Sequence, residues 1–291
     1  MSKISGALLC SMLLSSIFSG LIVSGVEVIR VPLSAQTIQI IGAGISSAGY
    51  LYFFHLFTKN MKKRDINAVS LKRKLSIYDG VSYLLLLLGA TTTLSKLTDY
   101  IVHYIKVNLI NGEINSKGVV ESFIGNVPIF IILLFVVIIS PIFEELLFRK
   151  ILLEKLLPYG KVIAIAISSL FFGLFHANLE QLLYTMFLGV LCANIVIITG
   201  KIKYAIYLHM SFNLFGGIIS DFIPTGTITT VLQIVFVMSA ALIIIFKGKA
   251  MFVLKDEDYD KNFCAKKEFL SIGFILYIAF FVISSIGKMS E

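Results

Sequence analysis

The sequence predicts an all-α fold, a polytopic membrane helix bundle of about 8–9 transmembrane helices. Hydrophobic residues make up 57% of the 291 residues and charged residues only 14%, whereas a soluble domain carries about 25% charged residues. The mean hydropathy is +0.93. Apolar runs recur at about the 20-residue length that crosses a bilayer. These runs lack period-two alternation, which favours helices over barrel strands.

Nine spans are expected, and their order follows from the apolar runs. They lie near 4–26, 38–58, 78–98, 126–146, 162–178, 181–199, 203–220, 228–246 and 268–287. The first run resembles a signal peptide, but its length and the spans that follow it favour a retained anchor. The stretch 99–118 mixes apolar and polar residues and is expected to form an amphipathic helix in the outer interface. Pro141 lies inside a helical pattern and should kink that helix.

The net charge of +8 is distributed as membrane topology requires. Together with Lys3, the loops 59–74, 149–161, 201–203 and 247–267 hold 20 of the 25 basic residues. All of these fall on one side if nine spans alternate, and the positive-inside rule makes that side cytoplasmic. The amino terminus is therefore expected inside and the carboxyl terminus outside. We expect a lipid bilayer as the surroundings and no nucleic-acid partner, and the sequence does not indicate an oligomeric state.

Other common site patterns are missing from the sequence. Its three cysteines are scattered without a CxxC pair, which argues against a disulfide framework or a cysteine zinc site. There is no HExxH motif, no GxSxG motif and no glycine-rich phosphate loop. Gly42, Gly44 and Gly49 are expected to allow close helix packing rather than nucleotide binding.

Two adjacent carboxylates interrupt the fourth apolar run. Because an ionisable group inside a membrane helix is costly, it indicates function by default. Glu145 and Arg149 are four residues apart and can pair on one helix face, which leaves Glu144 pointing about 100° away as a candidate general base. Alternatively, the three residues mark the cytoplasmic end of a span. The apolar run Ile151–Leu157 favours a helix that continues beyond them.

Of the four histidines, His176 and His209 lie inside predicted spans, whereas His55 lies at the end of one and His103 lies outside the spans. His209 and Asn213 are four residues apart, so they share a helix face and could both donate hydrogen bonds to a developing oxyanion. His176 follows a run of aromatic and aliphatic residues. The alternative is that each histidine is a hydrogen bonder in helix packing. Their occurrence within 70 residues of the glutamate pair favours a common site.

Three motifs in this order resemble those of the CPBP family, which comprises CAAX-type prenyl endopeptidases and bacteriocin-processing (Abi) proteins. The motifs are Glu144-Glu145-x-x-x-Arg149, Phe172-x-x-x-His176 and His209-x-x-x-Asn213. Lys150 and Lys201 depart from the family's usual residues but fall outside the acid–base set. The resemblance divides the chain into amino-terminal spans 1–120, a catalytic membrane core 121–220 and carboxyl-terminal spans 221–291.

The resemblance implies an intramembrane endopeptidase that acts on a membrane-associated peptide or protein in, we expect, a bacterial cell membrane. It implies that Glu144 and His176 activate a water, and that His209 and Asn213 stabilise the oxyanion. Glu145 and Arg149 would orient the helix. We expect no required cofactor. If a divalent metal such as zinc is bound, Glu144, His176 and His209 are the expected ligands.

Two other functions compete with this one. The first is a non-enzymatic bacteriocin-immunity or peptide-binding protein of the same fold, although a pure binder has no need of Glu144. The second is a small proton-linked transporter, for which duplicated halves would be expected. The protease hypothesis also faces a difficulty of depth, because the predicted spans put Glu144 near the cytoplasm and His176 near the outside. A helix that continued to Leu157 would bring the glutamates near mid-membrane.

Overall fold

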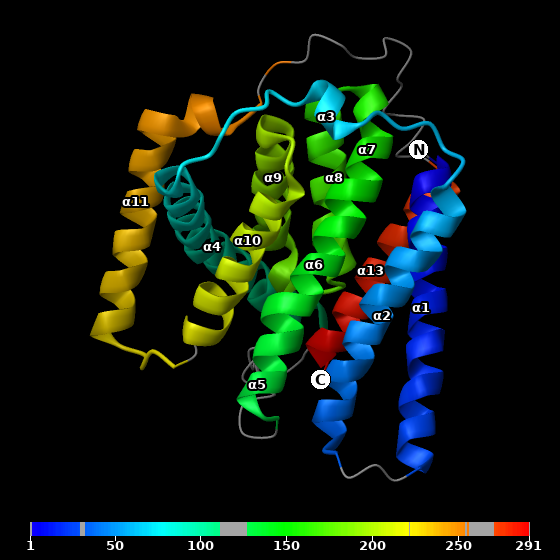
Figure 1. Cartoon of the computed structure of the whole chain (residues 1–291). Helices are drawn as coiled ribbons and strands as arrows, with labels where there is room; N and C mark the ends of the chain where they lie inside the picture. Colours follow the sequence, from blue (N-terminus) through cyan, green and yellow to red (C-terminus); the bar gives the residue numbers. More distant parts are fainter. Residues whose placement is uncertain are drawn as a thin grey trace. The chain divides into compact units, whose positions relative to one another are not determined.

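All regular secondary structure in the described part of the chain is helical. The computed structural model describes residues 2–29, 33–110, 127–220, 222–253, 255 and 271–290 (Figure 1). Six helices in these ranges are long and apolar enough to cross a membrane. They are α1 (Ser2–Val28), α2 (Ala35–Thr58), α4 (Ile77–Ile105), the continuous helix Ile129–Tyr159, α9 (Leu179–Thr199) and α11 (Thr227–Met251). The predicted all-α, polytopic membrane fold is confirmed.

The other three predicted spans fall on shorter helical segments. They are α8 (Lys161–Phe175), α13 (Ile272–Ser290) and α10 (Ile202–Phe212), which continues as the π-helix η5 (Asn213–Ile219). Each of the nine predicted spans therefore coincides with a helix, although only six satisfy the length and hydropathy of a full crossing. The prediction that a separate interfacial helix begins at residue 99 is wrong. Residues up to Ile110 instead continue α4 through η1 (Lys106–Ile110). The rest of the predicted helix 99–118 lies outside the described residues.

Local sequence fixes the helix ends. Ser76 and Asp79 form a reciprocal capping box at the start of α4, and the Asn178 side chain accepts from Glu180 N–H at the start of α9. Gly200, with φ of 73°, ends α9 in the left-handed conformation that glycine adopts without a steric penalty. An added Cβ there would also lie 2.8 Å from Ser70 Oγ.

The chain forms two compact units. The first comprises Met1–Met61, Lys117–Leu147 and Cys264–Tyr277. Within it, α1 and α2 pack closely through small residues: Ser19 Oγ donates to Gly42 O at 2.7 Å, and a Cβ on Gly49 would lie 3.0 Å from Ser15 Oγ. A Cβ on Gly44 would lie 2.7 Å from the Phe135 ring. These contacts confirm the predicted packing role of the glycines.

The second unit comprises Lys62–Ser116, Phe148–Phe263 and Ile278–Glu291. Its central helix is α9, which contacts α4, α8 and α10 (Figure 1). A short helix, α3 (Ile66–Val69), lies in the surface segment 62–76 that precedes α4. The division into 1–120, 121–220 and 221–291 follows the motifs rather than these contacts, and it stays a prediction.

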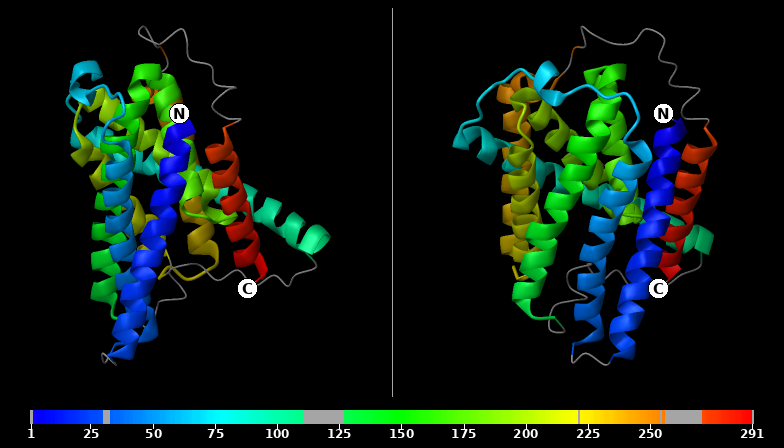
Figure 2. Two further views of the ribbon diagram at one scale, coloured as in Figure 1. Left: turned by 90° about the vertical axis from the view of Figure 1, so that its right-hand side faces the viewer. Right: turned by 45° about the vertical axis from the view of Figure 1, so that its right-hand side comes forward.

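The surface segment 62–76 joins the ends of several helices of the second unit. The Leu71 and Arg73 amides donate to Ile197 O and Ile198 O of α9, at 3.1 and 3.0 Å. Arg64 N–H donates to Glu154 O at 2.9 Å, and the Arg73 side chain donates to Ala250 O at 3.1 Å. Basic loops that are far apart in sequence therefore meet at one end of this unit, which we call the basic end (Figure 2). The cytoplasmic location of that end stays a prediction.

Candidate active site

The two glutamates lie at the middle of a long helix rather than at its end. Ile129–Tyr159 is continuous, and Glu144 is 15 residues from each terminus, about 22 Å along the axis. The predicted span 126–146 was thus too short, and the reading of the glutamates as the end of a span is wrong. The extension through Leu157, which the apolar run favours, is present.

The backbone around the glutamates departs from regular α-helix. The α-helical turn α6 (Ser140–Glu145) is flanked by the π-helices η2 (Leu133–Ile139) and η3 (Leu146–Leu152). Pro141, expected to kink the helix, lies at the second residue of α6, just after η2. π-Helical turns are rare and are often found at functional sites. Sequence patterns did not reveal them, because a π-turn changes the periodicity over too few residues.

Burial of these ionisable groups is nearly complete. Glu144 is 8% exposed, and Glu145 and Arg149 are fully buried. The Ser140 hydroxyl donates to Glu144 Oε1 from one turn earlier. Such a bond stabilises a carboxylate and fixes its orientation. Ser140 is therefore a site residue to which sequence reasoning assigned no role, although its spacing of four from Glu144 is a usable signal.

The boundary between the two units falls inside this helix, between Leu147 and Phe148. Glu144 and Glu145 belong to the first unit. Arg149, His176, His209 and Asn213 belong to the second. The structure brings three of the second unit's residues, Arg149, His176 and His209, together.

The Phe172 ring is the centre of the cluster in the second unit. Arg149 Cζ lies 5.0 Å from the ring centroid. The His176 and His209 rings approach it edge-on, with centroids at 5.3 and 5.6 Å. These residues come from three separate helices, η3, α8 and α10. Phe172 appears in the second sequence motif, but its role as the common contact emerges only from the tertiary structure.

Helix α8, which ends beside His176, is shorter than the predicted span. That helix starts at Lys161 at the basic end and has 15 residues, about 22 Å. The hydrocarbon core is about 30 Å thick, so α8 is shorter than a full crossing. His209 is seven residues into α10, about 10 Å from the basic end. The helix expected at 162–178 ends at Phe175, and the relative depth of Glu144 and His176 stays a prediction.

Hydrogen bonding suits His176 for proton transfer. Its Nδ1 lies 3.1 Å from Phe172 O, and because a carbonyl only accepts, Nδ1 carries the proton in this bond. In the neutral ring, Nε2 then has the lone pair that a proton acceptor needs. Ala177 follows in the left-handed region with φ of 47°. A tight buried turn thus holds the histidine between α8 and α9.

His209 and Asn213 share one face of α10. The backbone N–H of Asn213 donates to the His209 carbonyl. Asn213 is the residue where α10 passes into η5. His209 is buried and Asn213 is half-buried. An imidazole and a carboxamide at this spacing can direct two donors toward one oxygen.

Whether the Phe172 cluster could bind a metal ion depends on how many ligand side chains it offers. His176 and His209 are two nitrogen ligands beside one ring, and a protein zinc site takes three or four ligands. Among the described residues, no group of three His, Cys, Asp or Glu side chains is arranged to hold a metal ion. Within the second unit, the two histidines alone fall short of the ligands that a zinc site needs.

Comparison with known proteins identifies the segment that holds all six predicted residues. Residues 126–215 match the family model described as "Type II CAAX prenyl endopeptidase Rce1-like". The "Putative membrane peptidase YdiL" of Bacillus subtilis (strain 168) is 36% identical over 104 residues. That alignment covers 35% of this chain and 41% of the relative, so the chain spans less than half of the relative's length. No solved structure matches the chain. The resemblance to the CPBP membrane proteases is confirmed.

Proposed function

We propose that this integral, multi-pass membrane protein, whose residues 126–215 match the Rce1-like family, is an intramembrane endopeptidase. Its substrate would be a peptide bond in a membrane-associated peptide or protein. The observation that carries the proposal is the gathering of Arg149, His176 and His209 around Phe172, from segments far apart in an apolar helical chain. Ionisable groups inside membrane helices are costly, and function is the usual reason that a membrane protein retains them.

In the proposed reaction, Glu144 and His176 act together on a water molecule. Glu144 removes a proton as the water oxygen bonds to the carbonyl carbon, and the carbonyl electron pair moves to its oxygen. His209 and Asn213 donate hydrogen bonds to the resulting oxyanion. When the intermediate collapses, the C–N bond breaks and the proton held by the Glu144–His176 pair passes to the leaving amine.

Glu145 and Arg149 have a positioning role in this proposal. Both are fully buried and lie four residues apart, a separation that leaves side chains near one face of either an α- or a π-helix. An ion pair between them would fix the rotation of the helix that carries Glu144. Arg149 also packs against Phe172, so the same side chain would couple this helix to the histidines.

The proposed chemistry needs no obligatory metal. A carboxylate and an imidazole can activate water by proton transfer alone. We therefore expect the purified chain to keep its activity after dialysis against a chelator. Activity that is lost on dialysis and restored by zinc would replace this part of the proposal.

The direct test compares peptides in cells whose only copy of the chain is wild type or Glu144→Ala. We expect the variant to insert and fold, because removal of a buried carboxylate also removes a desolvation cost. Cleaved products found in wild-type membranes and medium should disappear. Glu180→Gln, a carboxylate in the first turn of α9, is the matched control and should keep wild-type products. Wild-type products from the Glu144→Ala strain would favour a peptide-binding or immunity protein of the same fold.

Convergence of the glutamate and the histidine has its own test. In a cysteine-free background, Glu144→Cys combined with His176→Cys should form a disulfide on mild oxidation, which requires Cβ atoms about 3.5–4.5 Å apart. Glu144→Cys combined with a cysteine at Ser220 is the control pair. A disulfide in the control pair and none in the Glu144–His176 pair would contradict the proposal that Glu144 and His176 share one site.

We also propose that the basic end faces the cytoplasm of a bacterial cell, on the basis of the positive-inside rule and the bacterial relative. A single cysteine introduced at Lys72 should then resist a membrane-impermeant thiol reagent in intact cells and react after lysis. Reaction in intact cells would reverse the orientation.

A further inference from the structure

We propose that a cavity between α4 and α10 binds an acyl chain of an anionic phospholipid, whose phosphate contacts the basic side chains at the cavity mouth. This site is separate from the Phe172 cluster, and it does not rest on the proposed protease activity.

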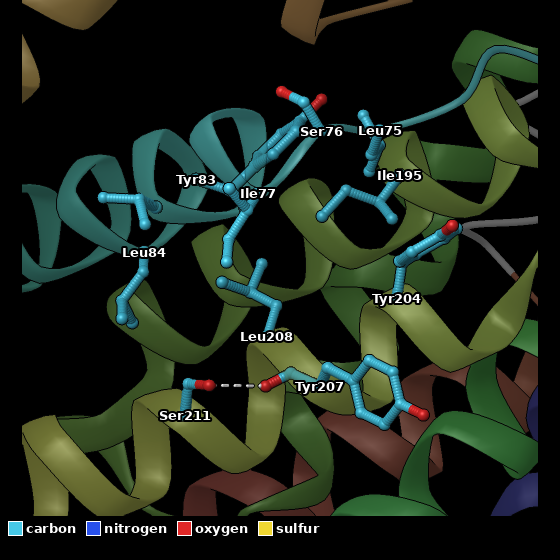
Figure 3. A pocket seen from close by; sticks show the side chains of 12 residues that line it. Leu75, Ser76, Ile77, Tyr83, Leu84, Ile195, Tyr204, Tyr207, Leu208 and Ser211 are labelled. Carbon is cyan, nitrogen blue, oxygen red and sulfur yellow. Dashed lines mark hydrogen bonds between the residues drawn. The ribbon is translucent and has the colours of Figure 1, made fainter.

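The cavity lies between the first part of α4 and most of α10, two helices of the second unit, and has a volume of about 350 Å³ (Figure 3). That volume is at the lower end of the range of about 300–1,000 Å³ typical of ligand pockets. Its wall combines α4, one residue of α9 and α10. The principal lining residues are Tyr83, Leu84, Ile195, Tyr204, Tyr207 and Leu208.

The lining is apolar, and its mouth is open at the surface of the unit. Ile77, Val81 and Tyr207 line the cavity and are 79%, 51% and 58% exposed. On helices of this hydropathy such exposed side chains face lipid. Gly80 leaves space between them, since a Cβ built on it would meet no atom within 4 Å. In a bilayer, acyl chains beside α4, a candidate membrane span, would reach the cavity from the side without crossing a polar barrier.

The depth of the cavity corresponds to one leaflet. On α4 the lining runs from Ser76 at the helix cap to Leu84, about 12 Å along the axis. On α10 it runs from Tyr204 to Ser211, about 10 Å. Half of the hydrocarbon core is about 15 Å thick. A chain held here would therefore have its headgroup at the basic end of the unit.

The charge at the mouth favours an anionic headgroup. Arg73 and Lys74 directly precede the lining residue Leu75, and Lys203 Nζ lies 5.4 Å from the centroid of the lining Tyr204 ring. Lys247 reaches the same region, donating to Ser82 Oγ at 3.0 Å.

One carboxylate opposes these cations. Asp79 lies 3.6 Å from Arg73 and 3.9 Å from Lys247. It also accepts from Ser76 in the capping box, so the amino terminus of α4 is already satisfied and is not the anion site. Among the residues that the structure describes here, a single carboxylate among four cations leaves the mouth positive, and a lipid phosphate complements that charge.

The experiment measures lipid retained by the full-length chain. The protein is reconstituted in vesicles of equal phosphatidylglycerol and phosphatidylcholine, extracted in mild detergent and washed, and the bound lipid is counted by mass spectrometry. Wild type should retain phosphatidylglycerol over phosphatidylcholine. Gly80→Phe fills the cavity and should abolish this retention. Gly20→Phe, on α1 where an added Cβ likewise meets no atom within 4 Å, should retain it.

Lys203→Gln tests the headgroup contact separately from the cavity. Loss of one cation near the lipid surface should weaken phosphatidylglycerol binding about fivefold and leave phosphatidylcholine unchanged. Because Lys203 is exposed, this variant decides the matter even if Gly80→Phe fails to fold.

Several outcomes overturn the proposal. They are equal retention of both lipids by wild type, unchanged retention by Gly80→Phe, and unchanged binding by Lys203→Gln. Loss of peptide cleavage in Gly80→Phe with normal lipid retention would assign the cavity to the peptide substrate instead. The Glu144→Ala variant should retain lipid normally, so failure of the proposed activity and failure of this site are distinguishable.

Discussion

Helices α9 and α11 have nearly the same hydropathy and opposite surroundings. Their most apolar windows have mean hydropathies of 2.2 and 2.5, yet 67% of the window is buried within the protein in α9 and only 6% in α11. Both belong to the second unit. Because lipid tails are as apolar as leucine, hydropathy alone does not separate a protein-buried helix from a lipid-facing one. The difference lies in the neighbours of each helix: α9 packs on α4, α8 and α10, whereas α11 packs chiefly on α4.

Small residues allow close approach to both helices. A Cβ on Gly89 of α4 would clash with Phe236 O of α11. In α9, a Cβ on Gly189 would lie 3.0 Å from Ser169 Cα of α8, so the two backbones nearly touch there. In α11, a Cβ on Gly248 would lie 3.8 Å from its nearest neighbour, an ordinary contact. The comparison teaches that the buried helix supports the site: α9 packs on α8 and α10, which carry the two histidines.

The largest expected effect is on stability and separates the two helices directly. Leu191 of α9 is fully buried, whereas Leu242 of α11 is 51% exposed. Leu191→Ala should cost about 2–5 kcal/mol, the range for a large-to-small change in a core. Leu242→Ala should change stability by about 0.5 kcal/mol or less. Thermal unfolding in detergent measures both, and equal losses would break the comparison.

The second largest expected effect is on the turnover rate and concerns Asn213 of the proposed site. Asn213→Ala should lower the turnover rate about 10²–10³-fold if the carboxamide donates to the oxyanion. The KM should change little, since the oxyanion exists only after attack. Ser220→Ala, at the exposed end of η5, is the control. The assay uses the cleaved peptide that the cellular comparison identifies, and an unchanged turnover rate would remove Asn213 from the mechanism.

Overpacking should produce a smaller effect on stability. Gly189→Leu forces α9 away from α8 and should cost about 1–3 kcal/mol. It should also lower activity, because α8 holds Phe172 and His176. Gly248→Leu on α11 is the matched substitution and should be tolerated. If both variants behave alike, helix approach does not distinguish the two regions.

The smallest effect concerns the surface segment that covers the end of α9. The Asn67 amide donates to the Asp65 carboxylate at 2.7 Å, and this backbone bond holds the pKa of Asp65 below its usual value. A lowered folded-state pKa stabilises the segment above the unfolded pKa of about 3.9. That stabilisation is lost as pH falls through the folded-state pKa.

Hydrogen exchange of the α3 amides should therefore accelerate on acidification in wild type. Asp65→Asn keeps a capping oxygen that does not titrate, so its exchange should show no such step beyond the intrinsic pH dependence. An identical acid step in the variant would assign the effect to another group.

Much of the fold followed from the sequence because a bilayer requires long apolar helices with internally paired backbones. The positions of the nine helical segments and the roles of Gly42, Gly44 and Gly49 were predictable on this basis. The end of the glutamate helix at Tyr159 was missed because the charged residues were read as a boundary. The early end of α8 was missed because His176 and Ala177 continue its apolar pattern.

By itself, the sequence determined a helical membrane protein and, through three short motifs, its resemblance to the CPBP proteases, since hydropathy and motif order are properties of the chain. Only the tertiary structure decided that α9 is enclosed while α11 faces outward, and that Phe172 is the common contact of Arg149 and the two histidines. The physical reason is that these features depend on distances of a few ångströms between segments far apart in the chain. Neither hydropathy nor periodicity contains that information.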